Sequence, residues 1–310
     1  MVNNLLINLV NSVLGKGKPT ARGNQAYHCP YCHHSKPKLE INFSEGNGGN
    51  NPWHCWVCNK RGNHIHSIFK FIKAPSEKIE ELKKIVKYSP KTVEQKQTQS
   101  VELPKEFKSL LEVTKHDIVG RHAITYLKRR GVTKSDILRY NIGYCEGGNY
   151  DKMIIIPSYN NEGRLNYFVA RNFNPSSPVK YKNPPMSKDV VPFEIFINWS
   201  SPLILVEGMF DALAVKRNAI PLLGKHIQKE LMKKIVTSEV QKIYIALDKD
   251  AQKDALDFCE QLKNEGKEVY LVDLEEKDPS EMGFENVTKL IQNTFPLSEY
   301  DLMEKKLQLV

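Results

Sequence analysis

Four cysteines in two matched pairs constrain the fold of this chain more than any other feature of its sequence. Cys29 and Cys32 form the first Cys-x2-Cys pair, and Cys55 and Cys58 form the second, with 22 residues between the pairs. Two intervening residues let both sulfurs of a pair turn toward one ion, and four thiolates suit tetrahedral Zn²⁺. The alternative is a redox pair or buried free thiols, but thioredoxin-like chemistry needs only one pair. We therefore expect one structural Zn²⁺ bound by all four cysteines, which leaves the neighbouring histidines unneeded as ligands.

The residues between the pairs have the pattern of a zinc ribbon. Residues 39–43 alternate between apolar and polar side chains and predict a strand, residues 46–51 are rich in Gly and Asn and predict a turn, and Trp53 begins a second strand. In such a module the metal replaces a core that is too small to hold the fold alone. We expect this β-rich module to span residues 1–75.

Aromatic and basic residues close to the cysteines suggest contact with nucleic acid. Rings stack on unpaired bases while Lys and Arg contact phosphates, which points to Trp53, Lys60 and Arg61 as template contacts. For Trp53 the alternative is that its ring simply covers the metal site.

The charge of the chain is divided unevenly. The 310 residues carry a net charge of +9. Residues 1–197 contain 30 Lys and Arg against 16 Asp and Glu, a net of +14, and residues 198–310 contain 15 against 20, a net of −5. A basic front part predicts a polyanionic partner, most simply nucleic acid. The acidic rear part either holds cations or is ordinary solvated surface.

The sequence lacks two features that would indicate a membrane or secreted protein. No apolar run approaches the roughly 20 residues that span a bilayer, so we expect no membrane partner. The N-terminus has neither a basic leader nor a small-residue cleavage site, so we expect a reducing cytoplasm in which the cysteines are thiols or metal ligands.

A helix and a linker follow the zinc module. Residues 77–86 have the spacing of a short charged helix, and residues 89–104 are polar, lack apolar periodicity and have a Pro near each end. We therefore place a helix and linker at residues 76–104, ahead of a basic subdomain at residues 105–200.

From residue 201 to 310 the chain alternates between strands and helices. Apolar strands are predicted at 203–206, 220–223, 243–247 and 269–272, and helices at 210–216, 228–236 and 253–265. This alternation predicts a mostly parallel sheet. A short helical tail at 287–291 and 300–309 either packs on that sheet or docks a partner.

Acidic residues follow several of these strands. Glu207 comes directly after the first, Asp248 and Asp250 follow the third, and Asp278 follows the last. Functional groups gather beyond the carboxyl ends of parallel strands, and unpaired carboxylates that meet there repel one another unless cations lie between them. Oxygen ligands suit Mg²⁺ or Mn²⁺, which assist phosphoryl and nucleotidyl transfer. The alternative is a set of solvated loop residues.

An ordered set of motifs resembles the bacterial and phage type of DNA primase. Glu207-Gly208 and Asp248-x-Asp250 are similar to the acidic motifs of the Toprim domain, and the cysteine segment is similar to the primase zinc-binding domain. The remaining motifs are similar to segments of the primase RNA polymerase core: 126–132, 140–144, 153–157, 163–165, 168–171, 180–184 and 277–279. The resemblance covers roughly residues 25–285, and the brevity of the chain favours a phage enzyme.

The resemblance implies an α/β multidomain protein in which a zinc ribbon is joined by a linker to a primase core with a Toprim domain. The implied activity is de novo synthesis of short RNA primers from NTPs on single-stranded DNA. Catalytic Mg²⁺ or Mn²⁺ would be held by Glu207, Asp248 and Asp250, with Asp278 as an additional acid. The implied contacts to nucleotide phosphates or template are Arg171, Lys180 and Lys182. Lys128, Arg129 and Arg130 would contact the DNA backbone, or they form a solvated face of a helix.

Several features qualify this expectation. Asp211 is expected either near the metals or on a helix surface, and Lys249 lies where the family often has a small or acidic residue. The chain has no Gly-x4-Gly-Lys-Ser/Thr motif, so the expected helicase partner is a separate chain. If the protein is phage-encoded, its location is the host cytoplasm.

Two other functions remain open. A small Toprim nuclease explains the acids but not the segments at 131–144 and 180–184. A non-catalytic, zinc-dependent single-stranded DNA-binding protein explains residues 25–75 and the positive charge but leaves the acids without a role.

Overall fold

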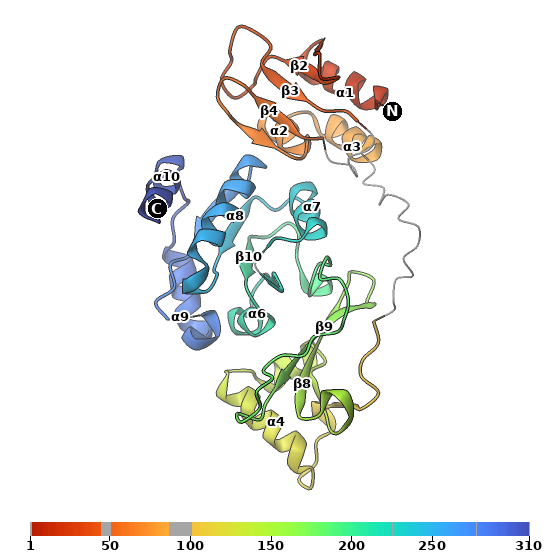
Figure 1. Ribbon diagram of the computed structural model, residues 1–310, viewed down its shortest axis with the longest axis vertical. Coiled ribbons are helices and arrows are strands. Elements are labelled where there is room, and N and C mark those ends of the chain that lie inside the picture. Colours follow the sequence, from red (N-terminus) through yellow and green to blue (C-terminus); the bar gives the residue numbers. More distant parts are fainter. Residues whose placement is uncertain (1, 45–50, 87–100, 225, 277, 310) are drawn as a thin grey trace. The chain divides into compact units, whose positions relative to one another are not determined.

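The computed structural model describes residues 2–44, 51–86, 101–224, 226–276 and 278–309 (Figure 1). The chain divides into two compact units. The first consists of Met1–Lys96 together with Lys234–Ser238 and Glu260–Glu268, and the second consists of Gln97–Lys233, Glu239–Cys259 and Val269–Val310. The predicted turn at 46–50, most of the predicted linker (89–100) and Lys277 lie outside the described residues.

The first unit is built on a five-stranded antiparallel sheet in the order β1-β2-β3-β4-β5. Its strands are β1 (Lys18–Pro19), β2 (Gln25–Tyr27), β3 (Leu39–Ile41), β4 (Trp53–Cys55) and β5 (Arg61–Gly62). Its helices include α1 (Asn4–Leu14), α2 (His66–Phe71) and α3 (Ser76–Ile85). The strands predicted on either side of the turn and the charged helix are therefore confirmed.

Strand register decides which side chains of this sheet are buried. Leu39 pairs with Cys55 and Ile41 pairs with Trp53, and these side chains form one core with Leu6, Leu9 and Val10 of α1. Paired residues share a face of a sheet, so the intervening row of Glu40, His54 and Arg61 lies on the opposite face. The helix α1 was not predicted from the sequence. Its apolar residues complete the core, and Asn3 caps its start by accepting a hydrogen bond from the Leu6 N–H at 3.0 Å.

The second unit begins with an antiparallel sheet in the order β6-β7-β8-β9. Its strands are β6 (Phe107–Ser109), β7 (Gly143–Cys145), β8 (Met153–Tyr159) and β9 (Leu165–Asn172). Between β6 and β7 lie the helices α4 (Ile118–Arg129) and α5 (Lys134–Arg139). Residues after β9 return alongside that strand, because the N–H of Lys182 donates to the carbonyl of Ala170 at 3.0 Å. The predicted motif at 180–184 is thereby held against β9.

A second sheet in this unit has the order β11-β10-β12-β13, and its central strand β10 is parallel to both neighbours. Its strands are β10 (Leu203–Val206), β11 (Ala219–Pro221), β12 (Lys242–Ile245) and β13 (Glu268–Leu271). The helices of this region are α6 (Met209–Val215), α7 (Lys229–Thr237), α8 (Gln252–Asn264), α9 (Pro279–Asn293) and α10 (Glu299–Gln308). The predicted alternation of strands and helices, and the parallel pairing, are confirmed.

The tail predicted to be helical is α9 and α10. Val287 and Ile291 of α9 belong to the large hydrophobic core that also contains β10 residues, so α9 packs on the sheet. None of the helices in the described ranges is long and apolar enough to cross a membrane.

Candidate functional site

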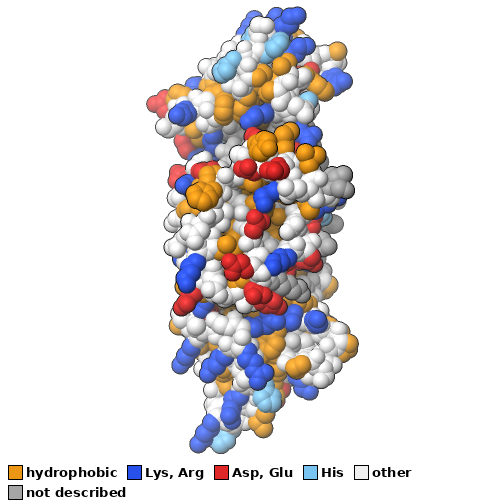
Figure 2. All heavy atoms as spheres, turned by 90° about the vertical axis from the view of Figure 1, so that its left-hand side faces the viewer, with side chains coloured by type: hydrophobic (Ala, Val, Ile, Leu, Met, Phe, Trp, Pro, Cys, Tyr) orange, Lys and Arg blue, Asp and Glu red, His pale blue; other side chains and the backbone are white. Residues whose placement is uncertain are grey.

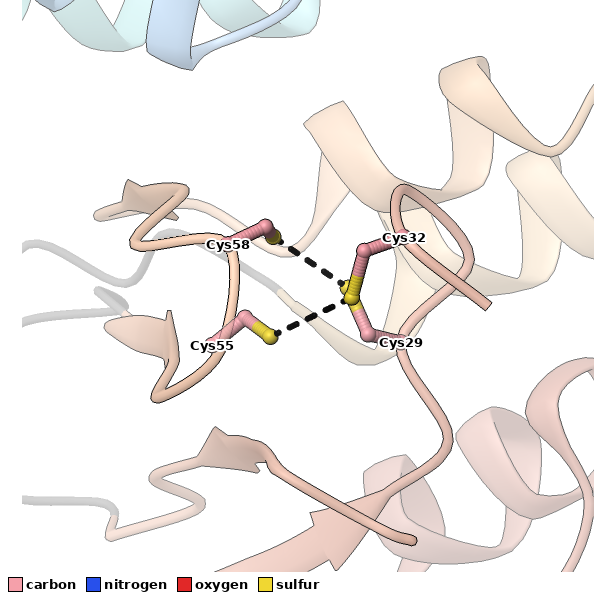
Figure 3. Close-up of side chains that lie close together, drawn as sticks. All are labelled: Cys29, Cys32, Cys55 and Cys58. Carbon is pink, nitrogen blue, oxygen red and sulfur yellow. Dashed lines mark hydrogen bonds between the residues drawn. The ribbon is translucent and has the colours of Figure 1, made fainter. Parts of the chain in front are cut away.

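The four cysteines lie together in the first unit, at two turns of the chain (Figure 3). Their sulfurs all lie within 4.8 Å of one another, and the Sγ–Sγ distances are 3.8 Å for Cys29–Cys58 and 3.8 Å for Cys32–Cys55. A tetrahedron with Zn–S bonds of about 2.3 Å has edges of about 3.8 Å. The sulfur positions therefore fit a single Zn²⁺, as the spacing of the cysteines predicts.

Both cysteine turns have the same backbone design. The N–H of His33 donates to the carbonyl of Cys29 at 3.0 Å, and the N–H of Asn59 donates to that of Cys55 at 2.9 Å. Both donors have left-handed backbone angles, with φ of 51° and 58°. Burial raises the pKa of the Cys29 and Cys58 thiols; for Cys55, hydrogen bonds from the Cys58 and Val57 N–H groups and from the Cys29 and Cys58 side chains together outweigh burial and lower the pKa. Lowering the pKa favours the thiolate that binds metal.

The neighbouring histidines contact other groups. The Nε2 of His54 lies 2.8 Å from the Asn59 side-chain oxygen, and the Nδ1 of His28 lies 3.3 Å from the His34 carbonyl. These contacts agree with the expectation that four cysteines complete the site.

The prediction that Trp53 stacks on a template base is wrong. Its side chain is only 3% exposed, its ring stacks on Tyr31 with centroids 5.4 Å apart, and its indole N–H donates to the His64 carbonyl at 3.2 Å. The two-residue period of a strand puts Trp53 on the same face as Cys55, and both belong to one hydrophobic core with Cys29. The alternative, that this ring covers the metal site, is what the structure has.

Trp56, an aromatic residue next to the second cysteine pair that the sequence also places near the metal site, is an exposed ring of the zinc module. It is 53% exposed, the Arg22 guanidinium lies 5.6 Å from its centre, and His54 packs against it edge-on at 4.4 Å. The predicted contacts Lys60 and Arg61 are exposed as well, and the Lys60 ammonium lies 5.3 Å from the Tyr31 ring.

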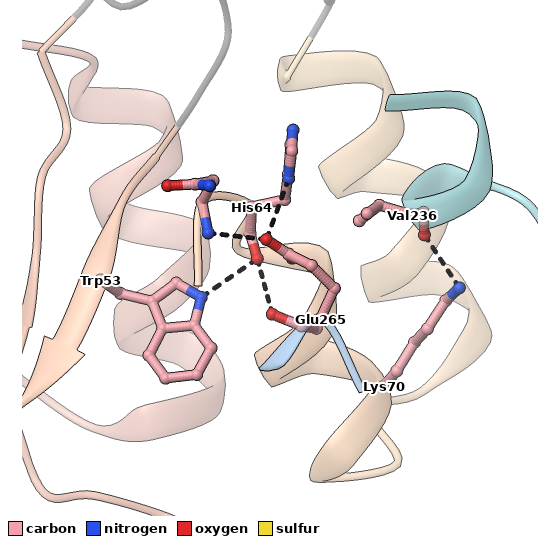
Figure 4. A network of polar contacts seen from close by, with 7 residues as sticks. Trp53, His64, Lys70, Val236 and Glu265 are labelled. Atoms are coloured by element: carbon pink, nitrogen blue, oxygen red, sulfur yellow. Dashed lines mark hydrogen bonds and ion pairs between the residues drawn. The ribbon is translucent and has the colours of Figure 1, made fainter. Parts of the chain in front are cut away.

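A buried polar network joins distant segments within the first unit (Figure 4). One carboxylate oxygen of Glu265 accepts the Asn63 N–H at 2.7 Å and lies 3.3 Å from His64 Nδ1. The Lys70 ammonium donates to the carbonyls of Val236 and Ser238 at 2.9 and 2.7 Å. No sequence motif pointed to this network, because it depends on residues about 200 positions apart.

The second metal-site candidate lies at the carboxyl edge of the parallel sheet. Glu207 directly follows β10 and Asp248 follows the adjacent strand β12. Burial, and after it the charges of Asp211, Glu207, Asp278 and Asp250, together raise the pKa of Asp248 to about 7. The other three predicted acids therefore all act on Asp248. Asp250 is exposed and its contribution is the smallest of these.

Two observations show that Asp248 and Asp211 lie in surroundings that disfavour their charged forms. The Oδ1 atom of Asp248 is buried without a hydrogen-bond partner among the described residues. Burial, followed by the charge of Asp278, raises the pKa of Asp211 to about 6. A divalent cation fits this set of oxygen donors. In the described ranges the cysteines are nevertheless the only group of three or more candidate ligands whose atoms all lie within 4.8 Å of one another.

Asp211 and Asp278 also position the backbone. Asp211 is 8% exposed, which excludes the surface alternative, and its two oxygens accept the N–H groups of Gly208 at 3.0 Å and Ser280 at 3.3 Å. Asp278 caps α9, because its Oδ1 accepts from the Glu281 N–H at 2.9 Å and the Ser280 hydroxyl at 2.7 Å. These bonds hold the starts of α6 and α9 beside the acids.

Guanidinium groups from the antiparallel subdomain face the same region. Arg171 Nε donates to the Tyr126 hydroxyl at 3.0 Å, and its guanidinium lies 4.4 Å from the centre of the Tyr181 ring. Arg130 lies 5.2 Å from the ring of Phe210, which is next to Asp211 on α6. Burial raises the pKa of Tyr181, Arg171 and Arg130 lower it, and Asp211 raises it. Tyr181 therefore contacts Arg171 directly and is within electrostatic reach of Arg130 and Asp211.

The other predicted basic contacts differ in their surroundings. Lys180 is exposed, as are Lys128 and Arg129 in the last turn of α4. Lys182 donates to the Asn149 carbonyl at 2.7 Å and lies 5.4 Å from the Tyr150 ring. On the face shown in Figure 2, Asp and Glu side chains gather over the middle of the molecule, and Lys and Arg side chains dominate the part below it.

Zinc removal tests the cysteine site. We expect Cys55→Ser to lose the bound zinc ion and to unfold the first unit, because the sulfurs are part of its core. Metal analysis and the Trp53 emission maximum, which should shift to the red, measure both effects. Cys145→Ser changes a buried cysteine outside the site and should retain zinc. A Cys55→Ser protein with full zinc content and unchanged emission would contradict the assignment.

The pKa of Asp248 predicts a pH dependence of stability. In the cation-free protein the folded state keeps a proton that the unfolded state loses near pH 4, so the free energy of unfolding should fall as pH rises toward about 7. Asp248→Asn should reduce this fall and stabilise the cation-free protein at pH 8 by about 1–2 kcal/mol, a value discounted for residual solvent contact. Urea unfolding at pH 5 and pH 8 measures it, and a variant less stable than wild type at pH 8 would refute the repulsion.

Comparison with known proteins identifies the elements of this arrangement. Residues 204–282 match the Toprim-like family. The DNA primase of Campylobacter jejuni is 22% identical over 245 residues, which cover 63% of this chain and 40% of that protein. The chain therefore spans less than half the length of this relative.

Solved structures of primases have a similar fold. The Aquifex aeolicus primase zinc-binding and RNA polymerase domains match with a TM-score of 0.50 and 21% identity, over 97% of this chain and 87% of that one. A DnaG primase catalytic domain bound to single-stranded DNA matches with a TM-score of 0.53 and 18% identity, over 65% of this chain and 78% of that one. The chain is thus a relative of bacterial DNA primases, with a Toprim-like domain and the fold of their zinc-binding and RNA polymerase domains.

Proposed function

We propose that this protein is a DNA primase that synthesises short RNA primers de novo from NTPs on single-stranded DNA. One observation carries the proposal: the Arg130 guanidinium of the antiparallel subdomain lies 5.2 Å from the ring of Phe210, the residue next to the buried Asp211 at the start of α6, so basic side chains reach the acidic edge of the Toprim-like domain. A site of this kind combines groups for a divalent cation with groups for phosphates.

Each set of residues has a distinct part in this reaction. Glu207, Asp248 and Asp250 would hold Mg²⁺ or Mn²⁺, and Asp278 would add a further acid. When bound, the cations make deprotonation of a ribose 3′-hydroxyl easier and stabilise the pyrophosphate that leaves. Arg171 and Arg130 hold NTP phosphates in line for attack, which is the main demand of nucleotidyl transfer.

The remaining basic residues belong to the template path in this proposal. Lys180, Lys182, Lys128 and Arg129 contact nucleotide or template phosphates, and the zinc module helps to select the template start. The similar catalytic domain solved with single-stranded DNA supports a template of that class. We further propose a separate replicative helicase as partner and, for a phage-encoded protein, the host cytoplasm as location.

The two alternative functions explain fewer observations. A Toprim nuclease leaves the segment at 180–184, held on β9, without a role. A zinc-dependent DNA-binding protein leaves the carboxylates with raised pKa values unexplained. Incubation with labelled NTPs, Mg²⁺ and a single-stranded template separates the three, since RNA ladders, shortened DNA and retained unchanged DNA are different products.

Asp248→Asn tests the catalytic assignment. We expect primer synthesis to fall about 100-fold or more, because a catalytic metal contributes several kcal/mol to transition-state stabilisation. The measurement is the yield of labelled RNA at saturating Mg²⁺. The control is Glu285→Gln, which neutralises an exposed carboxylate on α9 of the same unit and should prime normally. Full activity of Asp248→Asn would remove this residue from the mechanism.

Trp56→Ala tests the template role of the zinc module. Stacking on one base is worth about 1–3 kcal/mol, so affinity for single-stranded DNA should fall about fivefold or more. Fluorescence anisotropy with labelled oligonucleotides measures it, and Trp56→Phe should restore most of the affinity. Leu5→Ala, an exposed apolar position on α1 at 69% exposure, is the matched control. Equal affinities for Trp56→Ala and wild type would exclude stacking at this ring.

A further inference from the structure

A cavity of about 430 Å³ lies in the second unit beside Asp248. It is bounded by the ends of β12 and β13, by the first turns of α8 and by the end of α10. Clefts that bind small ligands have volumes of about 300–1,000 Å³. The cavity is therefore large enough for a nucleoside.

The position of this cavity connects it to the acidic edge. Because β10, β12 and β13 are neighbours in the sheet, Glu207, Asp248 and Asp273 follow successive strands along one edge. Asp248 belongs both to the acid cluster and to the cavity wall. A ligand in the cavity would thus extend to the oxygens that we assign to the cation.

The walls of the cavity differ from its rim. Leu247, Leu256 and Leu274 provide buried apolar surface. Gln252, Asp273 and Gln308 provide amide and carboxylate groups, which match the hydrogen-bonding edges of a base. Two cations, Lys249 and Lys305, complete the rim; Lys249 donates to the Glu275 carbonyl, and Lys305 lies 3.2 Å from Asp273.

The helix α10 is fastened over this cavity. Leu302 is 4% exposed, and Lys306 pairs with Asp257 of α8 at 3.2 Å. The helix that covers the cavity is therefore packed as part of the second unit.

We propose that this cavity receives the nucleoside of a ribonucleoside triphosphate whose phosphates lie at Asp248 and Lys249. The apolar walls cover the faces of the base, the rim amides meet its polar edge, and the triphosphate remains at the charged mouth. The proposal rests on the proposed primase function, which supplies the ligand class, and adds to it a subsite that includes α10.

Gln252→Trp tests the subsite, because Gln252 is exposed at the rim and a larger side chain there blocks the cavity with little effect on the core. Lys253→Trp is the matched control, since this neighbouring exposed residue does not line the cavity. Equilibrium dialysis with labelled ATP and Mg²⁺ should show a Kd raised about tenfold for Gln252→Trp, through lost burial of the base, and unchanged for Lys253→Trp. Affinity for inorganic triphosphate should be unchanged in both variants.

A second variant keeps the test decisive if Gln252→Trp does not fold. The double variant Gln308→Ala, Leu309→Ala removes the wall contributed by the end of α10 and should also weaken ATP, but not triphosphate. The same ATP affinity as wild type in whichever variant folds would overturn the subsite.

The primer assay separates this result from the proposed function. Normal priming with an unchanged KM for NTPs in Gln252→Trp would refute the subsite and leave the primase function intact. A wild-type protein that binds ATP in the cavity but makes no RNA would refute the primase function and support the subsite.

Discussion

Repulsion between carboxylates at the edge of the parallel sheet is the constraint on which the candidate active site depends. Parallel pairing of β10 with β12 places Glu207 and Asp248 beyond neighbouring strand ends, at the same edge of the sheet. Burial, followed by the charges of Asp211 and Glu207, raises the pKa of Asp248 to about 7. Acidic side chains with pKa values raised in this way indicate a site for cations and phosphates.

Asp211 has a different part in the same cluster. Both of its oxygens accept backbone N–H groups, one at the start of α6 and one at the start of α9. A side chain bound in this way fixes two helix termini and lends its charge to the site. Substitution at this position would therefore disturb geometry and electrostatics together, in contrast to the exposed Asp250.

Local pattern was sufficient to predict much of the fold. Period-2 alternation, strand-end acids and cysteine spacing each depend on residues close together in the chain, and they led to β3, β4, the parallel sheet and the sulfur cluster. The same alternation, applied from Cys55 back to Trp53, would have predicted that the Trp53 ring is buried. The stacking prediction was wrong because it rested on the residue composition near the cysteines, which does not show the face of the strand on which a side chain lies.

Other features could not be predicted from sequence patterns, because they arise from contacts between residues far apart in the chain. The Glu265 carboxylate meets Asn63 and His64 across about 200 residues, and no short pattern reports such a meeting. The exposure of Trp56 depends on where the second cysteine turn leaves the sheet. The cavity beside Asp248 exists only because α10 packs over the ends of β12 and β13.

The cap at the start of α9 limits how Asp278 takes part in cation binding. Its Oδ1 already accepts two hydrogen bonds, from the Glu281 N–H and the Ser280 hydroxyl. Oδ2 is the oxygen outside these bonds, so in the proposed site Asp278 would serve as a single-oxygen ligand as long as α9 keeps its first turn. Coordination through both oxygens would require the first turn of α9 to open. In the proposed site, the number of oxygens that Asp278 gives to the cation would therefore depend on whether this turn is folded.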